Sequence, residues 1–178
     1  MERFTEVVPP TTAVNLLPNS SFECGTSGWG SIAELPYGMG NLNLPVGEVD
    51  TTTAKYHRSS FKIELTEETI PVYHIDGWLY RIPVRAPLLA NKGWITVEPG
   101  AYYTLSAYMK ADSAGWYGAF SMQEAFGRTR QREVHLFTEW SRHSFMFRPE
   151  TEQIFVALGL NSDRQTGTVW IDGVQLVK

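Results

Sequence analysis

Hydrophobic and polar residues alternate with a period of two along much of the chain, and the wider spacing typical of amphipathic helices hardly appears. Residues 59–66, SSFKIELT, show the pattern clearly. Phe61, Ile63 and Leu65 would lie on one face of a strand, and the polar residues between them would lie on the other. The pattern therefore predicts a half-buried β-strand in this segment.

Five further segments are predicted to be strands on the same grounds. They are residues 100–112, 116–127, 140–149, 153–162 and 167–178. Turn-forming Gly, Pro, Asn and Asp residues separate many of these segments, and no convincing helix lies between them. This organisation predicts an all-β fold, an antiparallel β-sandwich rather than a parallel α/β sheet. The stretch from about Gly28 to Tyr56 is expected to be mostly loop, and a loop of that length in a compact domain is more often functional than accidental.

The composition is that of a single globular domain. The chain has 178 residues, of which 43% are hydrophobic, and it contains no apolar run long enough to span a bilayer. Its net charge of −4 comes from interspersed acidic and basic residues, so no basic stripe is available for nucleic acid. We therefore expect neither a membrane nor a nucleic-acid partner.

The N-terminal residues suggest that the domain was part of a longer protein. Residues 1–14 lack the apolar core of a signal peptide and contain the linker-like sequence VPPTTA. We interpret residues 1–14 as a linker or an expression-derived extension and residues 15–178 as the domain. The expected setting is a secreted or cell-surface multidomain protein.

The cysteine content argues against a disulfide and against a zinc site. Cys24 is the only cysteine, so an internal disulfide is excluded, and no Cys/His cluster indicates zinc. We expect Cys24 to be a small buried residue.

Aromatic residues make up 13% of the chain. Because Tyr and Trp combine a flat apolar face with a polar group, this content suits a recognition surface as well as a core.

Five segments in order resemble carbohydrate-binding modules of the 4/9/16/22 type, which are galactose-binding-like jelly-roll β-sandwiches. The segments are NLLPNSSFECGTSGW, HRSSFKIEL, ITVEPGAYYTLSAYMKAD, EWSRHSFMFRPE and GTVWIDGVQL. The resemblance covers roughly Asn15 to Lys178. It implies a non-catalytic module that holds a covalently linked, polysaccharide-degrading catalytic module on its substrate.

The resemblance also implies a structural calcium ion. The family places one carboxylate in an N-x-x-F-E element and another in a W-I-D-x-V strand, which correspond to Glu23 and Asp172. Backbone oxygens near Ser21, His57 and Ser60 would complete a set of oxygen ligands of the kind that Ca²⁺ takes. Many members read His-Ser-Gly where this chain reads HRSS, so the geometry of that loop stays open. Without the resemblance, Glu23 would be an ordinary turn carboxylate and Asp172 a strand-end acid.

Two segments interleave aromatic side chains with groups that hydrogen-bond sugar hydroxyls, namely residues 73–83 and 116–132. Aromatic rings stack on the apolar faces of sugars, and Arg and Gln bind the hydroxyls. The predicted ligand-binding residues are Trp78, Tyr80, Arg81, Trp116, Tyr117, Gln123, Arg128 and Arg130. Of the neighbours Trp116 and Tyr117, one is expected inside and one outside. The arginines could bind an anionic sugar or form a solvated edge, and Trp29 and Tyr37 in the long loop are further candidates.

Catalysis is not expected, because the chain lacks GxSxG, HExxH and GxxxxGK[ST] motifs. One enzymatic alternative is a jelly-roll polysaccharide lyase, which would use a tyrosine with a basic residue. The residue types for it are supplied by His74, Tyr80, Arg81 and His135. Another alternative is a protein-interaction or structural β-sandwich domain. The preferred hypothesis is a non-catalytic module that binds a polysaccharide or oligosaccharide, with the identity of the glycan left open.

Overall fold

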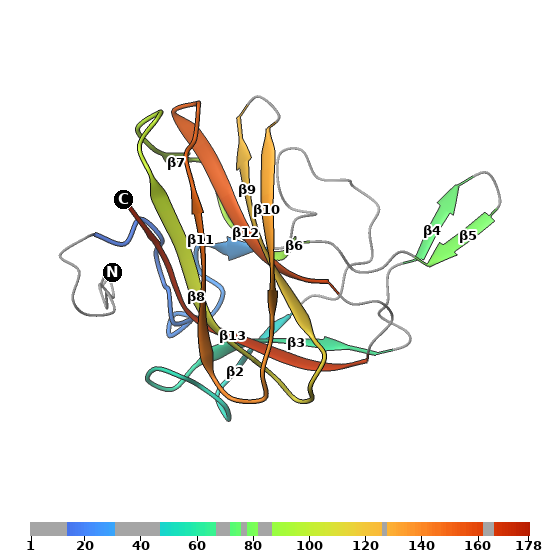
Figure 1. Ribbon diagram of the computed structural model, residues 1–178. Coiled ribbons are helices and arrows are strands. Elements are labelled where there is room, and N and C mark those ends of the chain that lie inside the picture. The colour runs from blue at the N-terminus through green and yellow to red at the C-terminus, as the bar shows by residue number, and fades with distance from the viewer. Residues whose placement is uncertain are drawn as a thin grey trace.

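The computed structural model describes residues 14–30, 47–66, 72–75, 78–81, 87–125, 128–161 and 166–178, with backbone alone for 72–75, 78–81, 87–88 and 161. These residues form antiparallel strands and no helix, and two large sheets pack face to face (Figure 1). The prediction of an all-β jelly-roll sandwich is confirmed. The described part of the chain accordingly contains no helix that could cross a membrane.

The first large sheet, called sheet A, has the strand order β1-β6-β12-β9-β10, and β7 also pairs with β12. Its strands are β1 (Trp29–Gly30), β6 (Pro87–Asn91), β7 (Ile95–Thr96), β9 (Tyr117–Glu124), β10 (Thr129–His135) and β12 (Gln153–Asn161). Strand β9 lies between β10 and β12, so both of its edges are paired.

The second large sheet, called sheet B, has the order β11-β8-β13-β3-β2. Its strands are β2 (Glu48–Asp50), β3 (Ser60–Leu65), β8 (Tyr103–Ala111), β11 (Ser141–Phe147) and β13 (Gly167–Val177). A separate two-stranded sheet consists of β4 (Val72–Ile75) and β5 (Trp78–Arg81).

All six segments with period-two alternation form strands, and their apolar positions face the core. In β3, Phe61, Ile63 and Leu65 are buried as predicted. Burying apolar side chains between the sheets is the main source of stability in such a sandwich. The stretch from Gly28 to Tyr56 includes the short strands β1 and β2, and residues 31–46 lie outside the described part.

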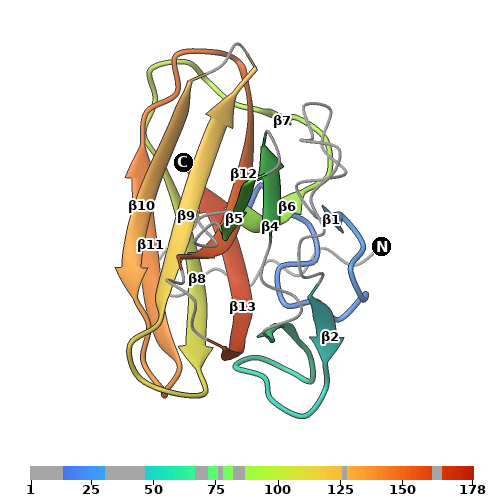
Figure 2. The ribbon, with the colours of Figure 1, turned by 90° about the vertical axis from the view of Figure 1, so that its right-hand side faces the viewer.

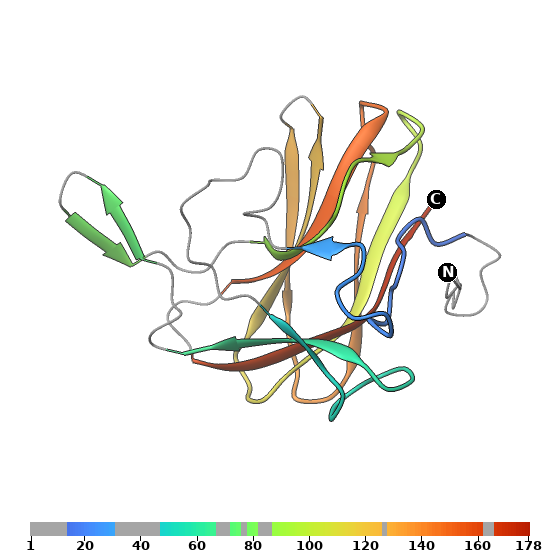
Figure 3. The ribbon, with the colours of Figure 1, turned by 180° about the vertical axis from the view of Figure 1, so that it is seen from behind.

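The N-terminal segment docks against the last strand. Leu16 N donates to Leu176 O over 2.9 Å, and Val174 N donates to Ser20 O over 2.9 Å. The side chain of Asn15 reinforces this contact because its Oδ1 accepts from Leu176 N (2.9 Å). Figure 3 shows this segment in blue beside the C-terminal end of β13. The first and last parts of the domain are thus joined, whereas residues 1–13 of the expected linker lie outside the described part.

Candidate functional site

Two acidic residues from distant parts of the chain bind the loop between β2 and β3. Glu23 Oε1 accepts hydrogen bonds from the backbone N–H groups of residues 58 and 59, at 3.0 and 2.7 Å. Asp172 Oδ2 accepts from the N–H groups of residues 55 and 56, both at 2.8 Å. The structure therefore brings together the two carboxylates that the resemblance singled out.

Asp172 is an unusual carboxylate because it is completely buried. Burial raises its pKa to about 6, since the charged form loses its hydration. Backbone hydrogen bonds from residues 55, 56 and Gly173 oppose this shift, and the negative charge of Glu23 adds to it. Two like charges thus converge at a partly desolvated position, which a cation between them would stabilise.

Both oxygens of Asp172 accept hydrogen bonds from backbone N–H groups, so an oxygen open to a cation has to come from Glu23 or from the backbone. Glu23 Oε2 accepts no hydrogen bond from the described residues, and Ca²⁺ prefers carboxylate and backbone oxygens. The backbone is left-handed at Phe22 (φ 59°) and His57 (φ 54°), a rare conformation for such residues that is often retained at functional sites. No group of three or more His, Cys, Asp or Glu side chains gathers in the described part, so backbone oxygens would have to supply most ligands.

The other expected calcium-site residues lie close to this loop in different ways. Ser21 is buried near Glu23 in the N-terminal segment. His57 stands between the two pairs of N–H groups that the carboxylates bind. Ser60 is fully buried at the start of β3, and its hydroxyl donates to Thr53 O over 2.5 Å. The hydroxyl of Ser60 is thus committed to the loop, and only its backbone oxygen fits the expected role.

The outer face of sheet A, which Figure 2 views from the front, holds two of the predicted ligand-binding residues. In β9, Phe120 and Met122 belong to the core, so alternation places Tyr117 and Gln123 on the opposite face. Tyr117 is 41% exposed, and Gln123 is half-buried. Between them lie only the small side chains of Ala119 and Ser121, so nothing on β9 rises between the aromatic and the amide.

Strand β10 extends this face with polar side chains that sequence reasoning did not select for sugar binding. In the register of β10 with β9, Gln131 lies beside Ser121 and Glu133 lies beside Ala119. His135 lies beside Tyr117, and their rings meet edge to face with centroids 5.2 Å apart. The alternation in RTRQREVH carries a signal for these residues, whereas the prediction from sequence selects the arginines between them.

Aromatic contacts continue from Tyr117 around the end of β10. The ring of Phe137 meets His135 at 5.2 Å and stacks on His143 at 6.3 Å. Phe137 is 52% exposed. Burial lowers the pKa of His143, and the proximity of His135 lowers it further. His143 therefore favours the neutral form at neutral pH.

Three aromatic or cysteine assignments need correction. Trp116 is completely buried, so its assignment to the binding surface is wrong, and Tyr117 is the exposed member of the pair. Trp29 is also buried, with its indole N–H shared between Pro18 O and Asn19 O at 3.2 Å. Cys24 is exposed rather than buried. The indole rings fill the wide space between the sheets, whereas Cys24 lies in a surface turn.

Arg128 and Arg130 do not lie beside Tyr117 and Gln123. Both point to Glu150 Oε1 at the end of the sandwich, at 2.5 and 3.4 Å. Alternation along β10 places Arg130 on the opposite face from Gln131. These two arginines therefore lie apart from the pair on β9.

The remaining candidates lie on the small sheet. Trp78, Tyr80 and Arg81 belong to β5, and His74 belongs to β4, where Tyr73 pairs with Tyr80. Their side chains lie outside the described part. The roles expected of these residues in sugar stacking, and in the lyase alternative, stay predictions.

The fold is that of carbohydrate-binding modules. The structure of TmCBM61 in complex with β-1,4-galactotriose matches with a TM-score of 0.61 and 16% identity, covering 92% of this chain and 98% of that one. A family 16 carbohydrate-binding module matches with a TM-score of 0.58 and 19% identity over 92% and 100%. The resemblance inferred from the sequence is thereby confirmed for the fold.

A third similar structure contains a catalytic module as well. It is the CBM22-1–GH10 part of Clostridium thermocellum endo-1,4-β-D-xylanase 10B complexed with xylohexaose, with a TM-score of 0.53 and 12% identity. The match covers 89% of this chain and 27% of that one. No protein-family model matches the sequence, and no curated protein matches it in sequence.

Proposed function

We propose that this protein is a non-catalytic carbohydrate-binding module that binds a glycan on the outer face of sheet A. The observation that carries the proposal is the arrangement of Tyr117 and Gln123 on one face of β9, with Gln131, Glu133 and His135 beside them on β10. This face combines an exposed aromatic ring with polar groups of the types that hydrogen-bond sugar hydroxyls.

In this proposal the ring of Tyr117 stacks on the apolar face of a sugar and supplies much of the affinity. Amide and carboxylate side chains select among hydroxyl patterns because each accepts or donates in a fixed plane. The small residues Ala119 and Ser121 leave space along β9 for a ligand that contacts both ends of the strand. A module of similar fold in complex with β-1,4-galactotriose supports a glycan as the ligand.

The proposal includes a structural calcium ion at Glu23 and Asp172. Glu23, Asp172 and backbone oxygens near Ser21, His57 and Ser60 would hold it, and the ion would neutralise the converging charges. Its effect would be structural, since an ion that binds only the folded state stabilises that state. It would fix the loop between β2 and β3 to both the N-terminal segment and β13.

The wider setting is also part of the proposal. We infer that the module belongs to a secreted or cell-surface protein and is linked to a polysaccharide-degrading catalytic module, which it holds on its substrate. The xylanase structure, in which a module of this fold accompanies a GH10 module, supports such an arrangement. The chain itself is expected to bind without reacting.

A panel of soluble polysaccharides in affinity electrophoresis, with analysis of released products, tests the proposal. If a polysaccharide retards the protein in the gel and no sugar products are released, the result supports a binding module. Release of sugar products would instead establish a lyase or another enzyme. Retardation that is unchanged when Tyr117 and Gln123 are both replaced by Ala would place the glycan elsewhere. A chain that is retarded by no glycan would support a protein-interaction domain.

A further inference from the structure

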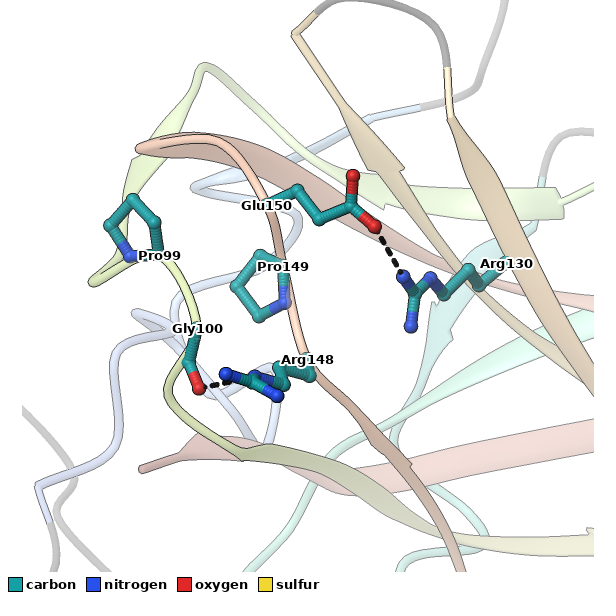
Figure 4. A pocket seen from close by; sticks show the side chains of 6 residues that line it. All are labelled: Pro99, Gly100, Arg130, Arg148, Pro149 and Glu150. Atoms are coloured by element: carbon teal, nitrogen blue, oxygen red, sulfur yellow. Dashed lines mark hydrogen bonds and ion pairs between the residues drawn. The ribbon is translucent and has the colours of Figure 1, made fainter.

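A hollow lies at the end of the sandwich, away from the proposed glycan face. It has a volume of about 500 Å³ and is lined by Pro99, Gly100, Arg130, Arg148, Pro149 and Glu150. These residues come from the turn before β8, from β10 and from the connection between β11 and β12. Figure 4 shows the guanidinium groups of Arg130 and Arg148 on two sides of Pro149. The volume is within the range of small-ligand sites and suits a sugar ring.

Arg148 is held in place while most of its donors stay available. Its Nε donates to Gly100 O over 2.6 Å, and its guanidinium lies over the ring of Tyr102 at 5.9 Å. Its two Nη groups have no hydrogen-bond partner among the described residues. Gly100 has a φ of +81°, and a Cβ there would approach Arg148 Nη2 to 3.3 Å, so the absence of a side chain lets the guanidinium lie close to the turn.

Arg130 is only weakly engaged. Its Nη2 lies 3.4 Å from Glu150 Oε1, which already forms a 2.5 Å ion pair with Arg128. Because a good charge-assisted hydrogen bond is much shorter, the donors of Arg130 are not satisfied by this contact. Two guanidinium groups with spare donors therefore border one hollow.

The charges at this end of the sandwich favour an anion. Two guanidinium groups, those of Arg130 and Arg148, and one carboxylate, that of Glu150, line the hollow. Glu150 is also paired with Arg128, which lies outside the lining. The lining therefore carries one more positive than negative charge. A planar or trigonal anion matches the fork of a guanidinium, and the rings of Pro99 and Pro149 offer apolar walls.

We propose that this hollow is a second binding site that takes the anionic group of a saccharide, a carboxylate or a sulfate ester, between Arg130 and Arg148. The choice of a saccharide rests on the proposed function, whereas the preference for an anion rests on the two arginines. The site is separate from the outer face of sheet A, so one ligand can in principle be bound at each.

Amide chemical shifts measured by NMR test this site directly, because Gly100 and Glu150 report on the hollow. The probes are trigalacturonate, its neutral counterpart galactotriose, and galactose 6-sulfate. Trigalacturonate, galactose 6-sulfate or both are expected to shift these amides, and galactotriose is not. Comparing the two acids tells whether the source of the anion is a uronate or a sulfate ester. Raising the salt concentration should weaken the shifts, since exposed charges are screened.

The variants Arg130→Gln and Arg148→Gln are each expected to weaken binding of the anion about tenfold, because each removes charge-assisted hydrogen bonds. Arg132→Gln is the matched control, since Arg132 is an exposed arginine on the same strand and does not line the hollow. Thermal unfolding checks that each variant folds, and Arg130→Gln leaves the bond between Arg148 and Gly100 intact.

Two results would overturn the proposal. One is equal shifts at Gly100 and Glu150 with charged and neutral sugars, or no shift with any. The other is an affinity for the acids that both glutamine variants retain or that Arg132→Gln lowers equally. Both results can be told apart from a failure of the proposed glycan face. Tyr117→Ala is expected to leave the anion-dependent shifts unchanged, even if no neutral glycan binds.

Discussion

Glu23 and Asp172 hold the same loop although they belong to the first and last parts of the domain. Each carboxylate accepts hydrogen bonds from two consecutive backbone N–H groups, at residues 58 and 59 for Glu23 and at residues 55 and 56 for Asp172. The loop between β2 and β3 therefore depends on both ends of the described domain. Two sequence elements that are far apart along the chain thus hold one loop.

Removing metal from the protein is expected to destabilise it if calcium binds at this pair. Dialysis against a chelator should lower the melting temperature, and added Ca²⁺ should restore it, because the ion binds only the folded state. Glu23→Gln and Asp172→Asn should abolish the response to Ca²⁺. Glu139→Gln, which changes an exposed carboxylate of a distant turn, should respond like the unchanged protein. Identical melting with and without chelator would contradict a structural calcium ion.

The pKa of Asp172 predicts how the stability of the calcium-free protein varies with pH. The pKa is raised from 3.8 to about 6 in the folded state, so between these values the folded protein binds more protons than the unfolded chain. The free energy of unfolding should therefore fall as the pH rises from 4 to 6, by at most about 3 kcal/mol. Urea unfolding at a series of pH values measures this. Asp172→Asn should remove the fall, and an identical profile in this variant would assign the effect to another group.

Replacement by Ala should destabilise the protein strongly at Trp116 and only slightly at its neighbour Tyr117. Trp116 is completely buried, so Trp116→Ala should lower the free energy of unfolding by about 3–5 kcal/mol. Tyr117→Ala removes an exposed ring and should change it by about 1 kcal/mol or less. Chemical denaturation of both variants provides the comparison. Similar losses for the two would mean that Tyr117 is a packing residue.

Asn15 should matter for stability although it lies outside the strands. Its Oδ1 accepts from Leu17 N and Leu176 N, and its Nδ2 donates to Val174 O. Asn15→Ala leaves these buried groups without partners and should cost about 2 kcal/mol or more. Ser144→Ala, on the exposed side of β11, is the control and should have little effect. A neutral Asn15→Ala would show that the N-terminal segment contributes little to the folded domain.

Much of the fold could be predicted because alternation in the sequence follows directly from burial on one side of a strand. Residues 59–66, for example, place Phe61, Ile63 and Leu65 inward in the structure as in the pattern. Alternation alone could not decide which of Trp116 and Tyr117 is inside. It shows that the two side chains point to opposite faces, but not which face is buried. The answer depends on tertiary structure: β9 pairs with β10 and β12, and in this sheet the ring of Trp116 packs into the core.

The candidate site was predictable only in part, because its residues come together through strand pairing. Glu23 and Asp172 were found through a resemblance, since their distance in sequence gives no sign that they share a loop. The sequence does not single out Gln131 and Glu133 among the neighbouring arginines, and only the strand register places them beside Ser121 and Ala119. Arg148 could not be grouped with Arg130 because it follows β11 of sheet B, whereas Arg130 lies on β10 of sheet A.

The most direct test of glycan binding across the outer face of sheet A is the variant Tyr117→Ala. Its affinity is measured for a polysaccharide that retards the unchanged protein in electrophoresis. Isothermal titration should show affinity lowered about tenfold, because a stacked aromatic ring is lost. Tyr102→Ala removes an exposed tyrosine away from this face and should bind a neutral polysaccharide as before. Equal affinities for the unchanged protein and Tyr117→Ala, with both folded, would contradict the claim.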